Sequence, residues 1–367
     1  MAKRPVTYRA LAIFWATMAA IAIAGAVTLQ RFGPPKPHAA SASASAPMAT
    51  LPAAPVAHPA TIPPPSDALL GPPTPPIPAL AGIQVPRVAD DRHTWPALYY
   101  AAPFNAADKT PRIALVVSGA GLDENLTLQL LRDVPGAVDI AFSAYMPPER
   151  ADTLAQAARE SGHECLLSIP MEPPSAPMAD EGPRQLIAGM DDGQYRENLF
   201  WSLSRLGGCV GATGAADNGM RGERFVTDPN FASMLAEITS RGLLYLDPAT
   251  HAPVLSRAGL QPATLPDPGR IDFVRKADAI IDESQNNEPL RDDDIRQNLT
   301  ALEKRASLER PPIGIAVNLN PRLVGILHDW AKGLPARGVM LVPLTAAPTM
   351  PPPLPAVLVP DPNQAKQ

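Results

Sequence analysis

Few residues in this chain could perform chemistry, and those few stand at the carboxyl ends of its predicted strands. A hydrolytic metal such as zinc needs histidine, aspartate, glutamate or cysteine ligands that converge from several elements, with one position left for water. The chain has six histidines, and only His251, just past Asp247, is placed near these strand ends. The sequence therefore predicts no metal site and no cofactor. The alternative is zinc or another divalent metal held by an unusual catalytic set, Asp217, Asp247 and His251.

The other polar residues at these strand ends are suited to binding. Hydroxyl, amide, carboxylate and guanidinium groups donate or accept hydrogen bonds, which a ligand rich in hydroxyl groups requires. The predicted ligand-binding residues are Ser118, Ser168, Asn218, Arg224, Asp247 and Asn318. Two of them have structural alternatives. Arg224 is equally suited to a salt bridge with Asp217 or Asp228, and Asp247 precedes a proline, as residues that begin a turn often do.

The stretch ALVVSGAGLDENL, residues 114–126, predicts a strand, a glycine turn and a helix. Such a turn holds a phosphate when three glycines recur in the dinucleotide-binding spacing. Here Glu124 stands where the third glycine belongs, and its carboxylate would repel a pyrophosphate. Ser118 also lacks the glycine pattern of a nucleophile elbow. We therefore expect Gly119 and Gly121 simply to make the turn from strand to helix.

The elements that position these residues alternate between apolar strands and helices from Trp95 to Leu344. The predicted strands are residues 113–117, 138–143, 164–170, 208–212, 243–247, 270–274, 313–319 and 339–344. The predicted helices are residues 124–131, 150–160, 195–206, 229–241, 290–308 and 321–332. This alternation indicates a parallel sheet covered by helices. The prediction is an α/β fold, a distorted (β/α) barrel of about seven parallel strands with its site at their carboxyl ends.

Five short motifs, which follow one another along the chain, carry a resemblance to a known family. They are PRIALVVSGAGLD, SGHECLLSIPMEP, RFVTD, GLLYLD and IGIAVNLNP. With the lead-in WPALYYAAPF they resemble the divergent polysaccharide deacetylase family over residues 95–345. The resemblance implies a distorted β/α barrel and metal-dependent removal of acetyl groups from a polysaccharide. It also implies a polysaccharide or peptidoglycan-type glycan as partner.

The chain departs from the family pattern at the residues that would bind metal or move protons. The pattern implies two adjacent aspartates, a histidine, an Asn-His pair and a Gly-His pair. The corresponding residues here are Ser118-Gly119, Ser168, Asn218-Gly219 and Val317-Asn318. The residues that keep the family type are Asp247, Glu172 and Arg224, and Glu172 is expected to shape its proline-rich loop.

These departures predict a catalytically degenerate, glycan-binding protein of carbohydrate and cell-envelope metabolism. Two alternatives remain open. One is an active metal-dependent carbohydrate deacetylase with an unusual ligand set, and the other is an envelope interaction protein that binds no glycan.

The two ends of the chain differ in composition from its middle. Residues 1–32 combine Lys3, Arg4 and Arg9 with an uncharged run from Leu11 to Leu29, which predicts an inner-membrane helix with the rest of the chain in the periplasm. A cleaved signal peptide is the alternative, and export follows from both. Residues 33–94 and 346–367 are rich in proline and are predicted to be a disordered linker and tail. The predicted barrel is residues 95–345.

The net charge and the two cysteines bear on the possible partners and on possible disulfide formation. The net charge is -5 and no Lys/Arg-rich run occurs, so the sequence predicts no nucleic-acid partner. Cys165 and Cys209 are the two cysteines. A disulfide and a pair of free buried thiols are both open for them. His163 precedes its strand, so we expect it to be a hydrogen-bonded residue at the opposite end of the barrel.

Overall fold

The computed structural model describes residues 61–173, 181–216, 219–220, 223–248, 273–282 and 290–347. The predicted membrane helix and nearly all of the predicted proline-rich tail lie outside these ranges. Within them, no helix is long and apolar enough to cross a bilayer.

Helices and strands alternate along most of the described chain. The α-helices are α2 (Pro96–Tyr99), α3 (Glu124–Asp133), α4 (Pro148–Glu160), α5 (Asp192–Leu203), α6 (Glu223–Val226), α7 (Pro229–Ser240), α8 (Asp292–Glu303) and α9 (Pro321–Gly333). The strands are β1 (Leu70–Gly71), β2 (Val85–Pro86), β3 (Arg112–Ala120), β4 (Val138–Ser143), β5 (Cys165–Ser168), β6 (Gly211–Thr213), β7 (Ala215–Ala216), β8 (Gly219–Met220), β9 (Leu244–Asp247), β10 (Val274–Lys276), β11 (Ala279–Ile280), β12 (Ile313–Ala316) and β13 (Met340–Leu341). Short 3-10 helices are η1 (Asp67–Leu69), η2 (Pro78–Leu80), η4 (Pro335–Arg337) and η5 (Leu344–Ala346).

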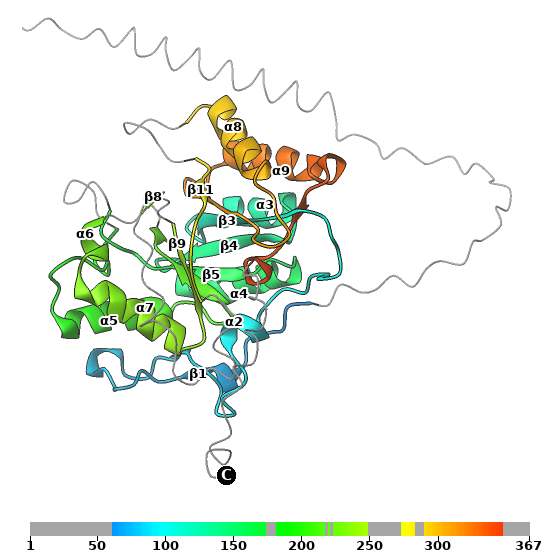
Figure 1. Ribbon diagram of the computed structural model, residues 1–367. Helices are drawn as coiled ribbons and strands as arrows, with labels where there is room; N and C mark the ends of the chain where they lie inside the picture. Colours follow the sequence, from blue (N-terminus) through cyan, green and yellow to red (C-terminus); the bar gives the residue numbers. More distant parts are fainter. Residues whose placement is uncertain are drawn as a thin grey trace, which may run out of the picture. The chain divides into compact units, whose positions relative to one another are not determined.

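A nine-stranded sheet forms the centre of the fold (Figure 1). Its strands lie in the order β10-β9-β6-β5-β4-β3-β12-β11, and β13 pairs with the first residues of β3. Every pairing in this sheet is parallel. In the described part of the chain no pairing joins the edge strands β10 and β11, so the sheet is a half-barrel. This arrangement confirms the predicted α/β architecture of parallel strands.

The sheet also differs from the sequence prediction in its edge strands. The strand expected at residues 270–274 is β10, at Val274–Lys276, and β11 was not predicted. Both edge strands are short, with three and two residues, so the apolar run that signals a strand is weak in each.

The sheet is buried on both faces, as parallel sheets are. Outward-facing residues such as Leu115 and Leu167 belong to one apolar cluster with residues of the helices. Their inward-facing neighbours Val116 and Leu166 belong to a second cluster, which includes Trp95 from the lead-in. Alternate residues of a strand point to opposite faces. The position of a residue along its strand therefore tells whether its side chain faces the helices or the hollow of the half-barrel.

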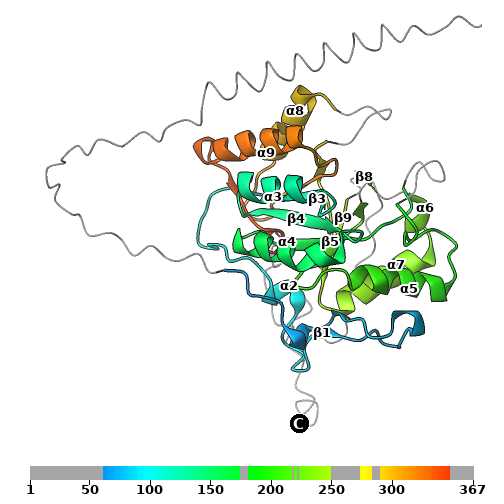
Figure 2. The same cartoon turned by 180° about the vertical axis from the view of Figure 1, so that it is seen from behind.

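The helices follow one another around the outer face. Helices α8, α9, α3 and α4 contact each other in that order, and α5 contacts α7 (Figures 1 and 2). Helix α7 begins as predicted at Asp228, whose Oδ1 accepts a hydrogen bond from the Asn230 N–H at 2.8 Å. Such caps satisfy backbone donors that the first turn leaves free.

Residues 61–94, predicted to belong to a disordered linker, are ordered. They form η1, β1, η2 and β2, and β1 pairs with β2 in antiparallel fashion. Their apolar side chains are spread thinly among prolines, yet they bury against the two clusters; these are Ile62, Leu69, Leu80, Val85 and Ala89. The Arg241 Nη1 atom donates to the Pro86 carbonyl at 2.9 Å and ties this segment to α7. Proline content misled the prediction because extended, proline-rich backbone can pack on an existing surface.

Gly211 in β6 lies at a close approach of two neighbouring strands. A Cβ atom at Gly211 would lie 2.5 Å from the carbonyl oxygen of Leu244 in β9. We expect Gly211→Ala to lower the free energy of unfolding by about 1–3 kcal/mol, the usual cost of overpacking a core. Gly207→Ala is the matched control, because a Cβ there meets no atom within 4 Å. Urea denaturation measures both, and equal losses of stability in the two variants would contradict the close approach.

Candidate functional site

Four buried hydroxyl groups lie along the carboxyl edge of the sheet, the edge where the parallel strands end. They come from β3, β4, β5 and β6 and are Ser118, Ser143, Ser168 and Thr213, each at most 2% exposed. The register places Ser143 beside Ser168, and Ser168 beside Thr213. By strand alternation all four face the hollow of the half-barrel. We call these four residues the hydroxyl row.

Ser118 and Ser168 contact each other across an intervening strand. Their Oγ atoms are 3.0 Å apart and hydrogen-bonded. Strands β3 and β5 are two positions apart, so their backbones would be roughly 10 Å apart in a flat sheet. The side chains meet because the sheet curls inward and β3 bends. The β3–β4 register shifts between Val117 and Ala120, and Gly119 has a φ of +86°, which favours glycine.

An ion pair lies in the chain that follows β5. The Arg224 Nη1 atom donates to Glu172 Oε1 at 2.6 Å, with the Arg224 side chain 71% exposed and that of Glu172 5% exposed. The second carboxylate oxygen of Glu172 accepts from the Ala188 N–H at 3.0 Å, so Glu172 shapes its loop as predicted. Among the described residues, the salt-bridge partner of Arg224 is Glu172, and the predicted partner Asp217 lies outside them. Asp228, one of the two predicted partners, instead accepts from the Gly189 N–H.

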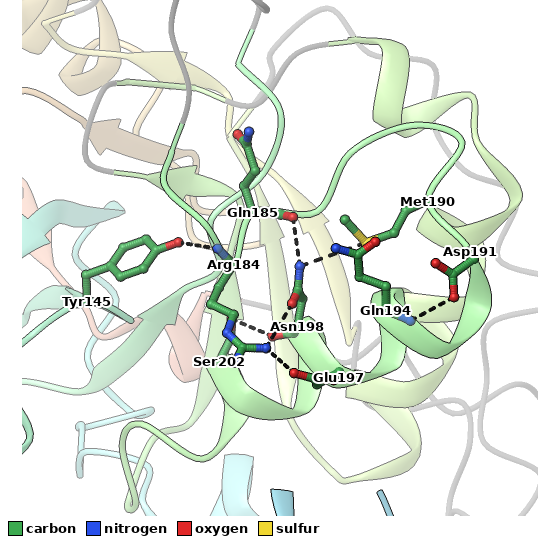
Figure 3. A network of polar contacts seen from close by, with 9 residues as sticks. All are labelled: Tyr145, Arg184, Gln185, Met190, Asp191, Gln194, Glu197, Asn198 and Ser202. Carbon is green, nitrogen blue, oxygen red and sulfur yellow. Dashed lines mark hydrogen bonds and ion pairs between the residues drawn. The ribbon is translucent and has the colours of Figure 1, made fainter. Parts of the chain in front are cut away.

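The loop that supplies the Ala188 contact is held by a polar network (Figure 3). The Tyr145 hydroxyl, just past β4, accepts from the Arg184 N–H at 2.9 Å. The Arg184 guanidinium forms an ion pair with Glu197 of α5, and Asn198 of the same helix donates to the Gln185 carbonyl at 3.2 Å. The network joins the end of β4 to α5 through residues 184–185. This anchoring fixes the backbone that leads to the Glu172 contact.

Asp247 ends β9 at the carboxyl edge and is 6% exposed. Its register partner is Lys276 of β10, so a cationic side chain projects from the same face of the sheet beside the Asp247 carboxylate. Tyr245, two residues earlier, packs in the outer cluster with the helices. Alternation therefore places Asp247 on the helix side of its strand and not with the hydroxyl row.

Asn318 is held by a residue that the sequence analysis did not single out. The two carboxylate oxygens of Asp282 accept from the Val317 N–H at 2.7 Å and the Asn318 N–H at 2.9 Å. The Asn318 side-chain amide donates to the Asp282 carbonyl at 2.6 Å. Burial raises the pKa of Asp282, while these hydrogen bonds oppose the shift. The sequence feature that could have pointed to Asp282 is the short apolar run before it, which forms strand β11.

The hydroxyl row is a poor fit for a catalytic zinc ion. Zinc in proteins is bound by thiolate, imidazole and carboxylate groups, and serine or threonine hydroxyls do not replace them. Across the described ranges, no three His, Cys, Asp or Glu side chains are grouped so that they could hold a metal ion. Three residues of the predicted sets, Asp217, Asn218 and His251, lie outside the described residues.

The other candidate residues have structural roles. The ring nitrogens of His163 contact two backbone carbonyl oxygens, that of Val138 at 2.6 Å and that of Leu131 at 3.1 Å. His163 is thus the buried, hydrogen-bonded residue that was expected, and burial lowers its pKa. Cys165 and Cys209 are free and buried, and burial raises the pKa of the Cys165 thiol to about 12. A thiol with such a pKa is a poor nucleophile.

A parallel half-barrel, with helices outside and polar residues along its carboxyl edge, fits the distorted (β/α) barrel class of proteins. The family model described as divergent polysaccharide deacetylase matches residues 115–347. The chain therefore belongs to the divergent polysaccharide deacetylase family.

Solved structures that are similar to the chain include the following two. The uncharacterized protein ATU2773 from Agrobacterium tumefaciens C58 has 26% sequence identity and a TM-score of 0.60, over 72% of this chain and 99% of that one. A family 4 carbohydrate esterase from Streptomyces lividans, in complex with acetate, has 11% identity and a TM-score of 0.37, over 66% and 100% of the two chains. No curated protein matches the chain.

The contacts of Asp282 make a stability prediction. Asp282→Asn replaces one carboxylate oxygen by an amide group that cannot accept the Val317 or Asn318 N–H. We expect a loss of about 1–3 kcal/mol in the free energy of unfolding, because a buried donor is left without its partner. The control is Asp329→Asn on α9, where the residue is exposed. Thermal unfolding checks both, and equal melting temperatures would show that Asp282 does not hold the end of β12.

Proposed function

We propose that this protein is a catalytically degenerate divergent polysaccharide deacetylase that binds a glycan at its carboxyl edge without hydrolysing it. The observation that supports this proposal is the hydrogen bond between Ser118 and Ser168. These positions are those where the family resemblance implies an aspartate and a histidine. Two hydroxyls that satisfy each other supply neither the negative charge nor the imidazole that a metal-bound water requires.

The glycan would bind through the polar groups around the hydroxyl row. Arg224 is mostly exposed and is oriented by Glu172, so its outward N–H groups can donate to a sugar hydroxyl or carboxylate. Asn318 stands at the next strand end on a backbone that Asp282 fixes. Of the other predicted residues, Ser118 and Ser168 are buried and bonded to each other, and Asp247 lies on the helix side of its strand, so the proposal rests on Arg224 and Asn318. A fixed set of donors and acceptors binds with less loss of conformational entropy than a mobile one.

The proposed location is the periplasmic side of the inner membrane. The uncharged run of residues 11–29 follows a basic start and has the length of a single membrane-spanning helix. A polysaccharide or peptidoglycan-type glycan of the cell envelope is the partner that suits this location and this family.

A metal and acetate measurement separates this proposal from its enzymatic rival. The rival is an active deacetylase that uses Asp217, Asp247 and His251. We expect the purified chain, incubated with zinc and then freed of excess metal, to hold less than one equivalent of metal. It should also release no acetate from an acetylated glycan. Stoichiometric zinc together with acetate release would overturn the proposal.

A pull-down with peptidoglycan sacculi tests the binding itself. Arg224→Ala removes the exposed donor, and we expect the affinity to fall by about tenfold or more, as for other hydrogen bonds to charged groups. Arg132→Ala is a matched control, because the Arg132 side chain on α3 is 69% exposed and that of Arg224 is 71% exposed. Equal binding by both variants would remove Arg224 from the site. No binding by the unaltered chain would favour an envelope interaction protein that binds no glycan.

A further inference from the structure

Two acidic residues lie side by side at the amino edge of the sheet, opposite the hydroxyl row. Asp139 is in β4, Glu164 immediately precedes β5, and both are 0% exposed. The register pairs Ile140 with Cys165, so the two acids, each one residue earlier, are neighbours. By strand alternation both point into the hollow of the half-barrel. Neither takes part in the site at the carboxyl edge.

These acids hold the lead-in and η5, two segments far apart in the sequence. Glu164 Oε1 accepts from the Ala102 N–H in the lead-in at 2.8 Å. Glu164 Oε2 accepts from the Thr345 N–H at 3.1 Å, and the Thr345 hydroxyl donates to the same carboxylate. Asp139 Oδ2 accepts from the Leu344 N–H at 2.7 Å. The lead-in and η5 are therefore fastened to the sheet by the same pair of carboxyl groups.

No cation of the described residues compensates the pair directly. Arg112 of β3 donates its Nη2 atom to the carbonyl oxygens of Ala106 and Asp108. Arg159 of α4 acts instead on the buried thiols of the helix side, where its charge lowers the pKa of Cys165. The hydroxyl of Tyr100 is engaged as an acceptor by the Ser66 N–H.

Burial without a counterion favours the protonated forms of the two acids. Burial, and then the charge of Glu164, raise the pKa of Asp139 well above its usual value. Burial raises the pKa of Glu164 to about 7, against its hydrogen bonds to Thr345 and Ala102, which lower it. A carboxyl group whose folded-state pKa is raised stabilises the fold below its unfolded pKa. That stability is lost as the pH rises through the folded-state value.

We propose that Asp139 and Glu164 form a pH-sensitive latch, which holds the lead-in and η5 against the sheet while Glu164 is protonated and loosens them when it ionises. Ionisation would place an uncompensated negative charge on Glu164 in a fully buried site, beside the Asp139 carboxyl group. Release of Ala102, Leu344 and Thr345 lets water reach the carboxylates. The latch acts on the lead-in that precedes β3 and on η5, which follows β13, and it is independent of glycan binding.

Hydrogen exchange on the full-length chain measures the latch. The protection factor, which corrects for the intrinsic pH dependence of exchange, reports local opening. With a pKa of about 7 when latched and an ordinary value of 4.5 when released, opening should increase roughly tenfold between about pH 6 and about pH 8.5. We expect this loss of protection in residues 97–103 and 340–347, and not in strands β4 to β6.

Three variants keep the test decisive. Glu164→Gln cannot ionise, so the tenfold change should disappear in the same segments. Glu160→Gln, at an exposed position on α4, should behave as the unaltered chain does. If Glu164→Gln fails to fold, the pH dependence of protection in the unaltered chain and in Thr345→Val decides the question. Thr345→Val should exchange faster at both pH values while keeping the pH dependence. Equal pH responses in latch segments and central strands would overturn the proposal.

Discussion

The inward curl of the sheet between β3 and β5 is the constraint on which the rest of the domain depends. It brings two side chains from non-adjacent strands within hydrogen-bonding distance, Ser118 and Ser168. A curled parallel sheet needs a helical layer outside and a filled hollow inside, and the two apolar clusters supply both. The hollow is closed at the amino edge by Trp95 and Leu344. At the carboxyl edge it ends in neutral hydroxyl groups. This curvature could bring metal ligands together. In this protein it brings together two hydroxyl groups that hydrogen-bond to each other.

Buried acidic groups of the described sheet lie at both of its edges. At the carboxyl edge, where barrel enzymes perform chemistry, Asp282 holds backbone N–H groups and Glu172 holds Arg224. Asp247, at the same edge, lies on the helix side of β9. The most strongly perturbed pair, Asp139 and Glu164, lies at the other edge. Perturbed pKa values often indicate a functional site, but structural roles produce them as well. In this protein the pair fastens chain segments, which a search for catalytic acids by pKa alone would misassign.

How far the sequence predicts the structure depends on how local each signal is. The central strands, the helix that starts at Asp228 and the glycine turn at Gly119 follow from neighbouring residues, so they were predicted. Strand β11 has two residues and residues 61–94 are rich in proline, and both are ordered mainly by distant contacts such as Arg241 with Pro86. The partner of Arg224 was missed for the same reason, since Glu172 lies 52 residues away. The family resemblance located the strand ends. Only the strand register of the structure shows that the side chains of Asp247 and Ser168 point to opposite faces of the sheet.

The packing of residues 61–94 has a mechanical consequence. Tension applied through the preceding chain would first load the hydrogen bond between Ser66 and Tyr100. It would next load the β1–β2 pair, and then the hydrogen bond between the Arg241 side chain and the Pro86 carbonyl. These contacts are on the amino side of the strands. The domain is thus built so that a pull on its leading segment is absorbed before strain reaches the far rim of the sheet.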